Sequence, residues 1–224
     1  MKYIILIPTY NPDERLLMIL EQINKKYDVV IVDDGSADKN LFKKCEDYAH
    51  VISYVENQGK GHALKTGLEY IKENYKKYVV VTMDDDMQHK LEDALKLCDY
   101  VSEHDEEFAI GRRHWDKTTP LTSRIGNAFA RFVFKKQTGL SIYDTQNGLR
   151  AFSNKLIDYM LGIKGERYEY EMNVLYGLKK SKIKYKEIDI ETIYIDNNKT
   201  SKFRLFRDSY KILKDMKKWK KNNR

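Results

Sequence analysis

Three consecutive aspartates, Asp84, Asp85 and Asp86, end an apolar run and are followed two residues later by Gln88. Carboxylate and amide oxygens at this spacing are hard ligands that suit Mg²⁺ or Mn²⁺ carrying a diphosphate. An acidic run this short is, on its own, more often a solvated loop or charge near a helix N-terminus. The elements around the run must therefore decide between the two interpretations.

The run before the aspartates, 78–83, is typical of a strand buried on both faces of a parallel sheet, because its valines show no polar alternation. Similar runs at 3–7, 28–32 and 51–55 are each followed by a helical pattern. This alternation predicts a single α/β domain with a mainly parallel, Rossmann-like central sheet flanked by helices. Ligands of such sheets bind at the carboxyl ends of the strands, which is where the aspartates stand.

The second half of the chain has a weaker pattern. We expect helices over 91–101, 123–137 and 169–178 and a short strand over 108–110. Residues 182–195 alternate apolar and charged positions in two segments, which is typical of half-exposed, antiparallel strands.

The chain has 224 residues, which is ample for one domain with a sizeable core. Its 41 Lys and Arg against 34 Asp and Glu give a net charge of +7. Ten basic and two acidic residues lie in 202–224, so residues 1–201 hold 31 basic and 32 acidic residues. We expect a nearly neutral domain over 1–202 and a separate basic helix over 203–224.

An apolar stripe at three- and four-residue spacing makes that last helix amphipathic. The stripe consists of Phe203, Phe206, Tyr210, Leu213 and Met216. Such a helix can lie on an anionic membrane surface, dock to a membrane partner protein, or pack on its own domain. No aromatic-rich RNA motif or recognition-helix pattern accompanies it, so we do not expect nucleic acid as a partner.

Targeting and redox signals are sparse. Cys45 and Cys98 have no metal-ligand spacing and are typical of a reduced cytosolic protein. The apolar run at 3–7 is too short for a signal peptide, and no run approaches the roughly 20 residues that cross a bilayer. We expect a cytoplasmic protein, peripheral at the inner face of the cell membrane.

Glycines at 59 and 61 flank Lys60 just before a helix. They lack the fuller spacing of a P-loop, and the chain has no GxGxxG, so neither a P-loop ATPase nor an ordinary dinucleotide dehydrogenase is supported. On their own these glycines are more often turn residues than a phosphate cradle.

Taken together, the motifs carry a resemblance. PTYN at 8–11, VDDGS at 32–36, NQGKG at 57–61 and DDDMQH at 84–89 each follow a predicted strand. In this order they resemble the family 2 glycosyltransferases with the GT-A fold. The motifs GRR, DTQNGLRAF, YEYE and SK narrow the resemblance to the polyprenyl-phosphate branch related to dolichyl-phosphate mannose synthase; they lie at 111–113, 144–152, 168–171 and 201–202.

The resemblance implies a role for each motif. The nucleotide-sugar site would comprise Pro8, Tyr10, Asn11, Asp33, Asp34, Lys60, Asp84, Asp85 and Arg112. The metal would be held by Asp86 and Gln88, and the acceptor phosphate by Arg113, Arg124, Arg150 and Lys202. Catalysis would depend on Asp84, Asp86, Arg124 and Arg150. The last motif departs from the family pattern, since Asp196 and Lys199 stand where relatives carry Arg and Gly.

We therefore expect a metal-dependent, inverting glycosyltransferase that moves a sugar from a nucleotide diphosphate sugar to a polyprenyl phosphate, with Mg²⁺ or Mn²⁺ as cofactor. UDP-sugars are the favoured donors and GDP-sugars the second choice, because either base can donate an N–H to Asp33 or Asp34. A phosphate acceptor needs positive charge rather than a strong base, and arginines supply that charge.

Two alternatives remain open. A family 2 enzyme of cell-surface polysaccharide synthesis would use a saccharide hydroxyl as acceptor and would need a catalytic base near the metal. Separately, Glu169 and Glu171 could approach the sugar, but on a helix they face different sides, so at most one does, and ordinary surface charge explains them equally well. The alternative of another class is a non-catalytic nucleotide-binding or membrane adaptor module.

Overall fold

A computed structural model describes residues 1–114 and 121–193, and within the helix that begins at residue 121 it describes side chains from residue 126 onward. The strands are β1 (Lys2–Thr9), β2 (Asp28–Asp33), β3 (His50–Ser53), β4 (Tyr78–Thr82), β5 (Phe108–Arg113), β6 (Arg150–Ser153) and β7 (Tyr185–Ile190). The α-helices are α1 (Arg15–Ile23), α2 (Asn40–Cys45), α3 (Lys60–Asn74), α4 (Leu91–Glu103), α5 (Leu121–Thr138), α6 (Ile157–Gly162) and α7 (Glu169–Lys180), and a 3-10 turn, Asn154–Leu156, precedes α6.

The strands form one sheet in the order β3-β2-β1-β4-β6-β5-β7. β1, β2, β3 and β4 run parallel to one another, β6 runs antiparallel to both β4 and β5, and β7 runs parallel to β5. The chain first builds outward from β1 to β3 and then returns to place β4 on the other side of β1. The sheet order therefore reverses between β1 and β4.

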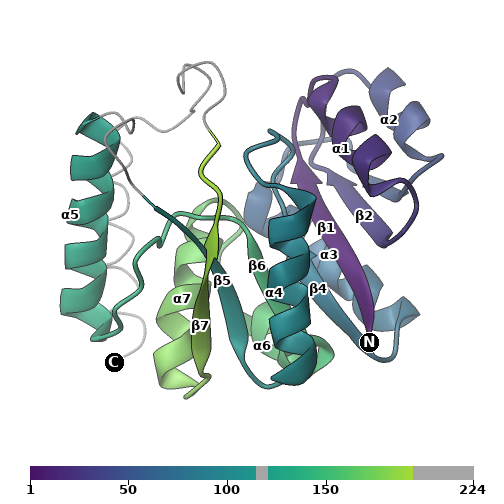
Figure 1. Ribbon diagram of the computed structural model, residues 1–224. Coiled ribbons are helices and arrows are strands. Elements are labelled where there is room, and N and C mark those ends of the chain that lie inside the picture. Colours follow the sequence, from purple (N-terminus) through teal and green to yellow (C-terminus); the bar gives the residue numbers. More distant parts are fainter. Residues whose placement is uncertain (115–120, 194–224) are drawn as a thin grey trace.

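The sheet is buried on both faces because alternate residues of each strand enter different cores. In β1, Ile4 and Leu6 pack with α3, α6 and α7, whereas Ile5 and Ile7 pack with α1, α2 and α4. All four side chains are fully buried. Figure 1 shows these two helical layers, with α1 and α4 in front of the sheet and α3, α6 and α7 behind it. The unbroken apolar runs in the sequence follow from this double burial.

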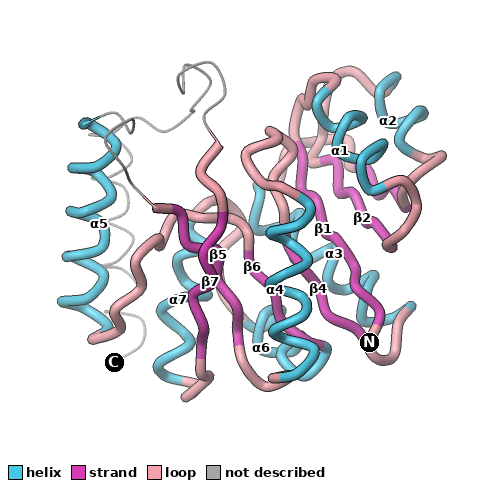
Figure 2. Tube along the Cα trace, viewed as in Figure 1, coloured by secondary structure: helices cyan, strands magenta, loops and turns pink. Residues whose placement is uncertain are grey.

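The prediction of a mainly parallel α/β fold is confirmed, and the four strands and three helices of residues 2–82 lie close to the positions expected from the sequence, although the second helix, α2, has only six residues. The prediction for 182–195 was wrong in direction. Residues 185–190 form the single strand β7, which pairs parallel to β5 over six residues, and the antiparallel strand is β6. The short helix α6 was not predicted. Figure 2 shows β7 at the edge of the sheet, beside β5.

Several predicted features lie outside the described residues. They include Lys202 and the amphipathic helix over 203–224. Arg124 belongs to α5, but its side chain is outside the described part as well. Among the residues that are described, none of the helices combines the length and apolar character needed to traverse a bilayer.

Candidate active site

The acidic loop after β4 lies where the sheet order reverses. Ligands of open α/β sheets bind at the carboxyl ends of the strands at such a point. The backbone N–H of Met83 donates to the carbonyl of Leu6 at 3.0 Å, and the Thr9 hydroxyl donates to the Asp85 carboxylate. The loops that follow β1 and β4 are therefore joined at the place where a ligand is expected.

Lys60 connects three elements at this edge. It is the first residue of α3, and its ammonium lies 2.7 Å from Asp84 Oδ1, after β4, and 3.0 Å from Glu171 Oε2, on α7. Burial alone would lower the pKa of Lys60, but the two carboxylates raise it above its usual range. Burial likewise would raise the pKa of Asp84, and the Lys60 ammonium nevertheless lowers it. Lys60 and Asp84 are thus both charged at neutral pH.

Asp86 and Gln88 supply further oxygens to this loop. Asp86 Oδ1 accepts a hydrogen bond from the backbone N–H of Gln88 at 3.0 Å. Burial and then the charge of Asp84 raise the pKa of Asp86, so ionisation of its carboxylate is disfavoured. A bound divalent cation would favour the ionised form.

The donor set fits a cation whose coordination the protein completes only in part. Within residues 1–114 and 121–193, no group of three or more His, Cys, Asp or Glu side chains is placed to hold a metal. Mg²⁺ is usually held by one or two carboxylates together with substrate phosphates and water. The oxygens of Asp84, Asp86 and Gln88 are of the right kind for that arrangement.

His89 lies buried beneath the acidic loop. Its Nε2 is 3.9 Å from Asp84 Oδ2, and its Nδ1 has no hydrogen-bond partner in the part of the chain that the structure describes. Burial lowers the pKa of His89 to about 4. The ring is therefore neutral at neutral pH and leaves the negative charge of the loop unchanged.

The two aspartates predicted to read the nucleobase make contacts within the chain. Asp33 is fully buried, accepts from the backbone N–H of Ser36 at 2.8 Å and forms an ion pair with Lys39. Asp34 accepts from two backbone N–H groups of the loop before α3, at 2.7 and 2.8 Å. Both carboxylates hold the loops after β2 and β3 in place. Both oxygens of the Asp33 carboxylate are thus engaged within the chain, one by Ser36 and the other by Lys39.

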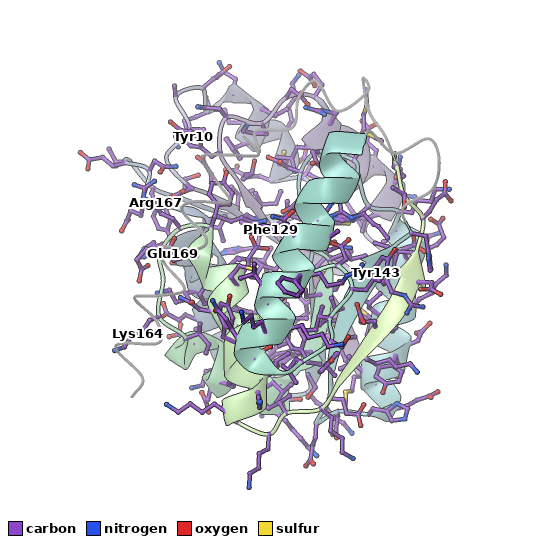
Figure 3. The ribbon with its side chains drawn as sticks, turned by 90° about the vertical axis from the view of Figure 1, so that its left-hand side faces the viewer. Tyr10, Phe129, Tyr143, Lys164, Arg167 and Glu169 are labelled. Carbon is purple, nitrogen blue, oxygen red and sulfur yellow. The ribbon has the colours of Figure 1, made fainter. Side chains whose placement is uncertain are left out.

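Asn11 joins the first of these loops to the second. Its backbone N–H donates to Ser36 Oγ at 2.8 Å, and its side-chain oxygen accepts from the N–H of Ala37 at 3.1 Å. Pro8 is buried in β1, whereas Tyr10 is 44% exposed. Figure 3, in which α5 faces the viewer, labels Tyr10 at the upper left of the molecule. The Tyr10 ring is open to stacking by a ligand.

The adjacent arginines of β5 point to different sides of the strand, as successive strand residues do. Arg113 binds Asp144 side-on, with Nε at 2.7 Å and Nη2 at 3.2 Å, and its charge acts on both Asp84 and Asp86. Arg112 instead pairs with the exposed Asp189. The structure thus brings Arg113 into the site and leaves Arg112 on the outer side.

Arg150 is fixed inside the protein. Its guanidinium donates to the backbone carbonyls of Asn147 at 3.0 Å, Glu171 at 2.6 Å and Thr145 at 3.4 Å. The residue is 3% exposed, and burial lowers its pKa. These contacts favour a structural role, in which Arg150 ties the loop before β6 to the first turn of α7.

A family model described as glycosyl transferase family 2 matches residues 4–161. The chain belongs to this family. It is 30% identical to the UDP-N-acetylglucosamine–dolichyl-phosphate N-acetylglucosaminyltransferase of Methanococcus voltae, with 86% of each chain covered. It is 28% identical to the dolichyl-phosphate beta-glucosyltransferase of Saccharomyces cerevisiae, with 95% of this chain and 72% of the relative covered. These relatives confirm the resemblance to the polyprenyl-phosphate branch.

Solved structures agree on the fold of this family 2 glycosyltransferase. The glucosyl-3-phosphoglycerate synthase of Mycobacterium tuberculosis, in complex with Mn²⁺, uridine-diphosphate-glucose and phosphoglyceric acid, matches with a TM-score of 0.60 at 16% identity. The match covers 89% of this chain and 74% of that one. The GT-A fold predicted from the sequence is thereby confirmed.

Between the two glutamates that the sequence left open, Glu171 is the one that reaches the site of this family 2 enzyme. Its carboxylate binds Lys60, whereas Glu169 Oε1 accepts from the backbone N–H groups of Glu166 and Arg167 at 3.2 and 3.3 Å. Figure 3 shows Glu169 close to Arg167, at the turn before α7. Helical spacing predicts that only one of the two glutamates reaches inward. Which of them does so depends on where α3 packs against α7.

The glycines beside Lys60 allow α3 to approach the turn before α7. A Cβ on Gly61 would lie 2.6 Å from Tyr170 Cβ and 2.9 Å from the Arg167 carbonyl oxygen. A Cβ on Gly59, whose φ is +112°, would lie 2.4 Å from the Glu166 carbonyl oxygen. The glycines at 59 and 61 are therefore needed for close packing, which brings Lys60 and Glu171 together.

We expect Gly61→Ala to lower the free energy of unfolding by about 2 kcal/mol, because the added methyl meets backbone and Cβ atoms that cannot move independently. Denaturant unfolding measures this change. Gly162→Ala is the matched control, since a Cβ there meets nothing within 4 Å. A loss of stability at Gly162 equal to that at Gly61 would contradict the packing argument.

Proposed function

We propose that the protein is a metal-dependent, inverting glycosyltransferase that moves a sugar from a nucleotide diphosphate sugar to a polyprenyl phosphate. The observation that carries the proposal is the ion pair between Asp84 of the acidic loop and the Lys60 ammonium at the switch point of the sheet, where the charge of Arg113 also acts on Asp84 and Asp86. The names of the archaeal and yeast relatives, both of which refer to dolichyl phosphate, support the lipid phosphate as acceptor.

The charges at this edge suit departure of a nucleotide. A sugar that leaves a diphosphate develops negative charge on the phosphate and positive charge at the anomeric carbon. A divalent cation, when bound, stabilises the departing phosphate as a Lewis acid. In our proposal Asp84, Asp86 and Gln88 form the metal and diphosphate site, with Asp86 and Gln88 as the main ligands and Asp84 as a further oxygen ligand, and Lys60 supplies a second positive charge. In-line attack by the acceptor then inverts the anomeric centre.

The basic groups favour a phosphate acceptor over a saccharide hydroxyl. A phosphate monoester is already a nucleophile and needs cations to bring it next to a second anion. Arg113 offers its charge at the site, and we propose that Arg124 and Lys202 join it. Of the two glutamates on α7, the one that reaches the site, Glu171, is already paired with the Lys60 ammonium at 3.0 Å, and it would have to leave that ion pair to act as the base for a hydroxyl acceptor.

For the donor we favour UDP-sugars, with GDP-sugars second. Both bases present an N–H that Asp33 can accept once Lys39 moves aside, and Tyr10 offers an exposed ring beside them. The archaeal relative is named for a UDP-sugar, which supports the same choice.

A lipid acceptor requires access to a membrane, and we propose peripheral contact at its cytoplasmic face through 203–224. Within the described residues, α5 contributes Phe129 and Phe132, which are 47% and 65% exposed. Figure 3 shows Phe129 on the outward side of α5. Basic residues at 131, 135 and 136 lie on the same helix, which suits an anionic surface.

A donor panel tests this function. UDP- and GDP-sugars are each incubated with Mn²⁺, with and without a short polyprenyl phosphate, and product is separated by solvent extraction. We expect transfer to the lipid phosphate, a fall of at least about 100-fold on adding EDTA, and recovery with Mn²⁺ or Mg²⁺. Transfer to a saccharide but never to the lipid would replace this function with the hydroxyl-acceptor alternative. Nucleotide binding without any transfer would indicate a binding module.

A further inference from the structure

The carboxylate of Glu171 stands where its charge is unexpected. The site proposed above must accept a nucleotide diphosphate, and a carboxylate beside a bound anion repels it. Glu171 is nevertheless held firmly inward, with its side chain 17% exposed and its backbone carbonyl bonded to Arg150 at 2.6 Å. A negative group placed so firmly next to an anion site requires a reason.

The contact with Lys60 supplies that reason. The ammonium lies between two carboxylates, 2.7 Å from Asp84 and 3.0 Å from Glu171, and these belong to different elements. With Asp84 as its sole partner, Lys60 would remain on the acidic loop. There it would occupy an oxygen that the cation also needs, and it would lie away from the phosphates. The second carboxylate holds the ammonium in place while the charge of Asp84 is taken up by other groups.

We propose that Glu171 is a positioning residue for donor binding, which holds the Lys60 ammonium at the diphosphate position when Asp84 turns to the metal. This inference rests on the proposed function and deepens it. Glu171 acts through Lys60, and the proposal gives it no contact with the reacting atoms. Glu169, two residues away, has the same charge, but its carboxylate accepts hydrogen bonds from the backbone of the turn before α7.

A positioning role and a simple charge effect of Glu171 predict opposite changes in the affinity for UDP when Glu171 is replaced by Gln. If Glu171 acts only as a negative charge, Glu171→Gln removes a repulsion and strengthens the binding of UDP, which is an anion. If Glu171 positions Lys60, the same change weakens UDP binding. The weakening must then disappear when Lys60 is replaced, because no ammonium is left to position. A double-mutant cycle separates the two cases.

The experiment measures the dissociation constant of UDP by calorimetry at saturating Mn²⁺ for the parent, Lys60→Met, Glu171→Gln and the double variant. We expect Lys60→Met to weaken UDP binding about 10- to 30-fold, as loss of a charged hydrogen bond does. We expect Glu171→Gln to weaken it about 5- to 10-fold in the parent, and to leave it unchanged or tighter in the Lys60→Met background. Glu169→Gln is the matched control and should change binding less than about 2-fold.

A second variant guards against misfolding of Glu171→Gln. Glu171→Asp keeps the charge but withdraws it by one methylene, so it weakens UDP binding if position matters and leaves it unchanged if charge alone matters. If the parent binds UDP and Glu171→Gln binds it equally well or more tightly, this inference is overturned while the proposed function stands. The same holds if Glu171→Gln weakens UDP binding equally in the parent and in the Lys60→Met background. Failure of the parent to bind either UDP or GDP in the presence of Mn²⁺ would overturn both.

Discussion

Asp86→Ala is expected to reduce sugar transfer about 1000-fold, because in the function proposed here it removes a ligand of the cation that would stabilise the departing diphosphate. The folded protein should not lose stability. Burial and the charge of Asp84 raise the pKa of Asp86, so the folded state binds this proton more tightly than the unfolded state does. Above its folded pKa the ionised side chain therefore opposes folding, and its removal leaves the melting temperature equal or higher.

Steady-state transfer and thermal unfolding of the same preparation check both parts of this expectation. Asp158→Ala is a suitable control, since it removes a carboxylate that is 78% exposed and pairs with Lys72 on α3. It should retain transfer within about 2-fold of the parent. Equal turnover by Asp86→Ala and the parent at limiting Mn²⁺ would remove Asp86 from the metal site. A large drop in melting temperature would show that the residue is structural instead.

The parallel half of the fold could be predicted because its signal is redundant. β1, β2 and β4 are apolar runs buried on both faces, β3 is a short and partly exposed edge strand, and a helical pattern follows each of the four. The four motifs lie at strand ends, so once the sheet is parallel they must share an edge. That geometry brings residues 8–11 to residues 84–89, as the contact of Thr9 with Asp85 shows.

The other half could not be predicted in the same way, since its strands carry less information. Alternation in 182–195 indicates which residues face the core but not in which direction the strand pairs. β6 has four residues, all buried, which is too short for a period to show. The direction of β7 follows from α7, which carries the chain back across the sheet so that β7 can lie parallel to β5. A sequence pattern does not report such a crossover.

Sequence reasoning also cannot tell whether a polar group at a strand end is free to meet a ligand. Arg112 and Arg113 are equivalent in the sequence, and only the partners Asp189 and Asp144 separate them. The family pattern placed Arg150 among the phosphate ligands, whereas the structure shows its donors engaged by backbone carbonyls. These contacts join segments that fold together only in the tertiary structure, so no local signal precedes them.

Arg150→Met should lower the free energy of unfolding by about 3 kcal/mol, because it removes three hydrogen bonds from a charged donor and leaves buried carbonyl oxygens without them. For a chain of 224 residues this corresponds to a fall in melting temperature of roughly 6 to 12 °C. Thermal unfolding followed by circular dichroism measures it. Nucleotide binding should weaken as well, because the Arg150 guanidinium holds the backbone of Glu171.

Arg112→Met supplies the matched comparison, since it removes the same charge from β5 at a side chain that is 34% exposed and pairs with a carboxylate that is 56% exposed. An exposed ion pair contributes at most about 1 kcal/mol, so the melting temperature should fall by no more than about 4 °C. If Arg150→Met instead had the melting temperature of the parent and lost only the transfer of sugar to the polyprenyl phosphate, the guanidinium would be a phosphate ligand. Its hydrogen bonds to the backbone carbonyls would then have to break when the acceptor binds. Stability therefore distinguishes an arginine that organises the site from one that binds the acceptor.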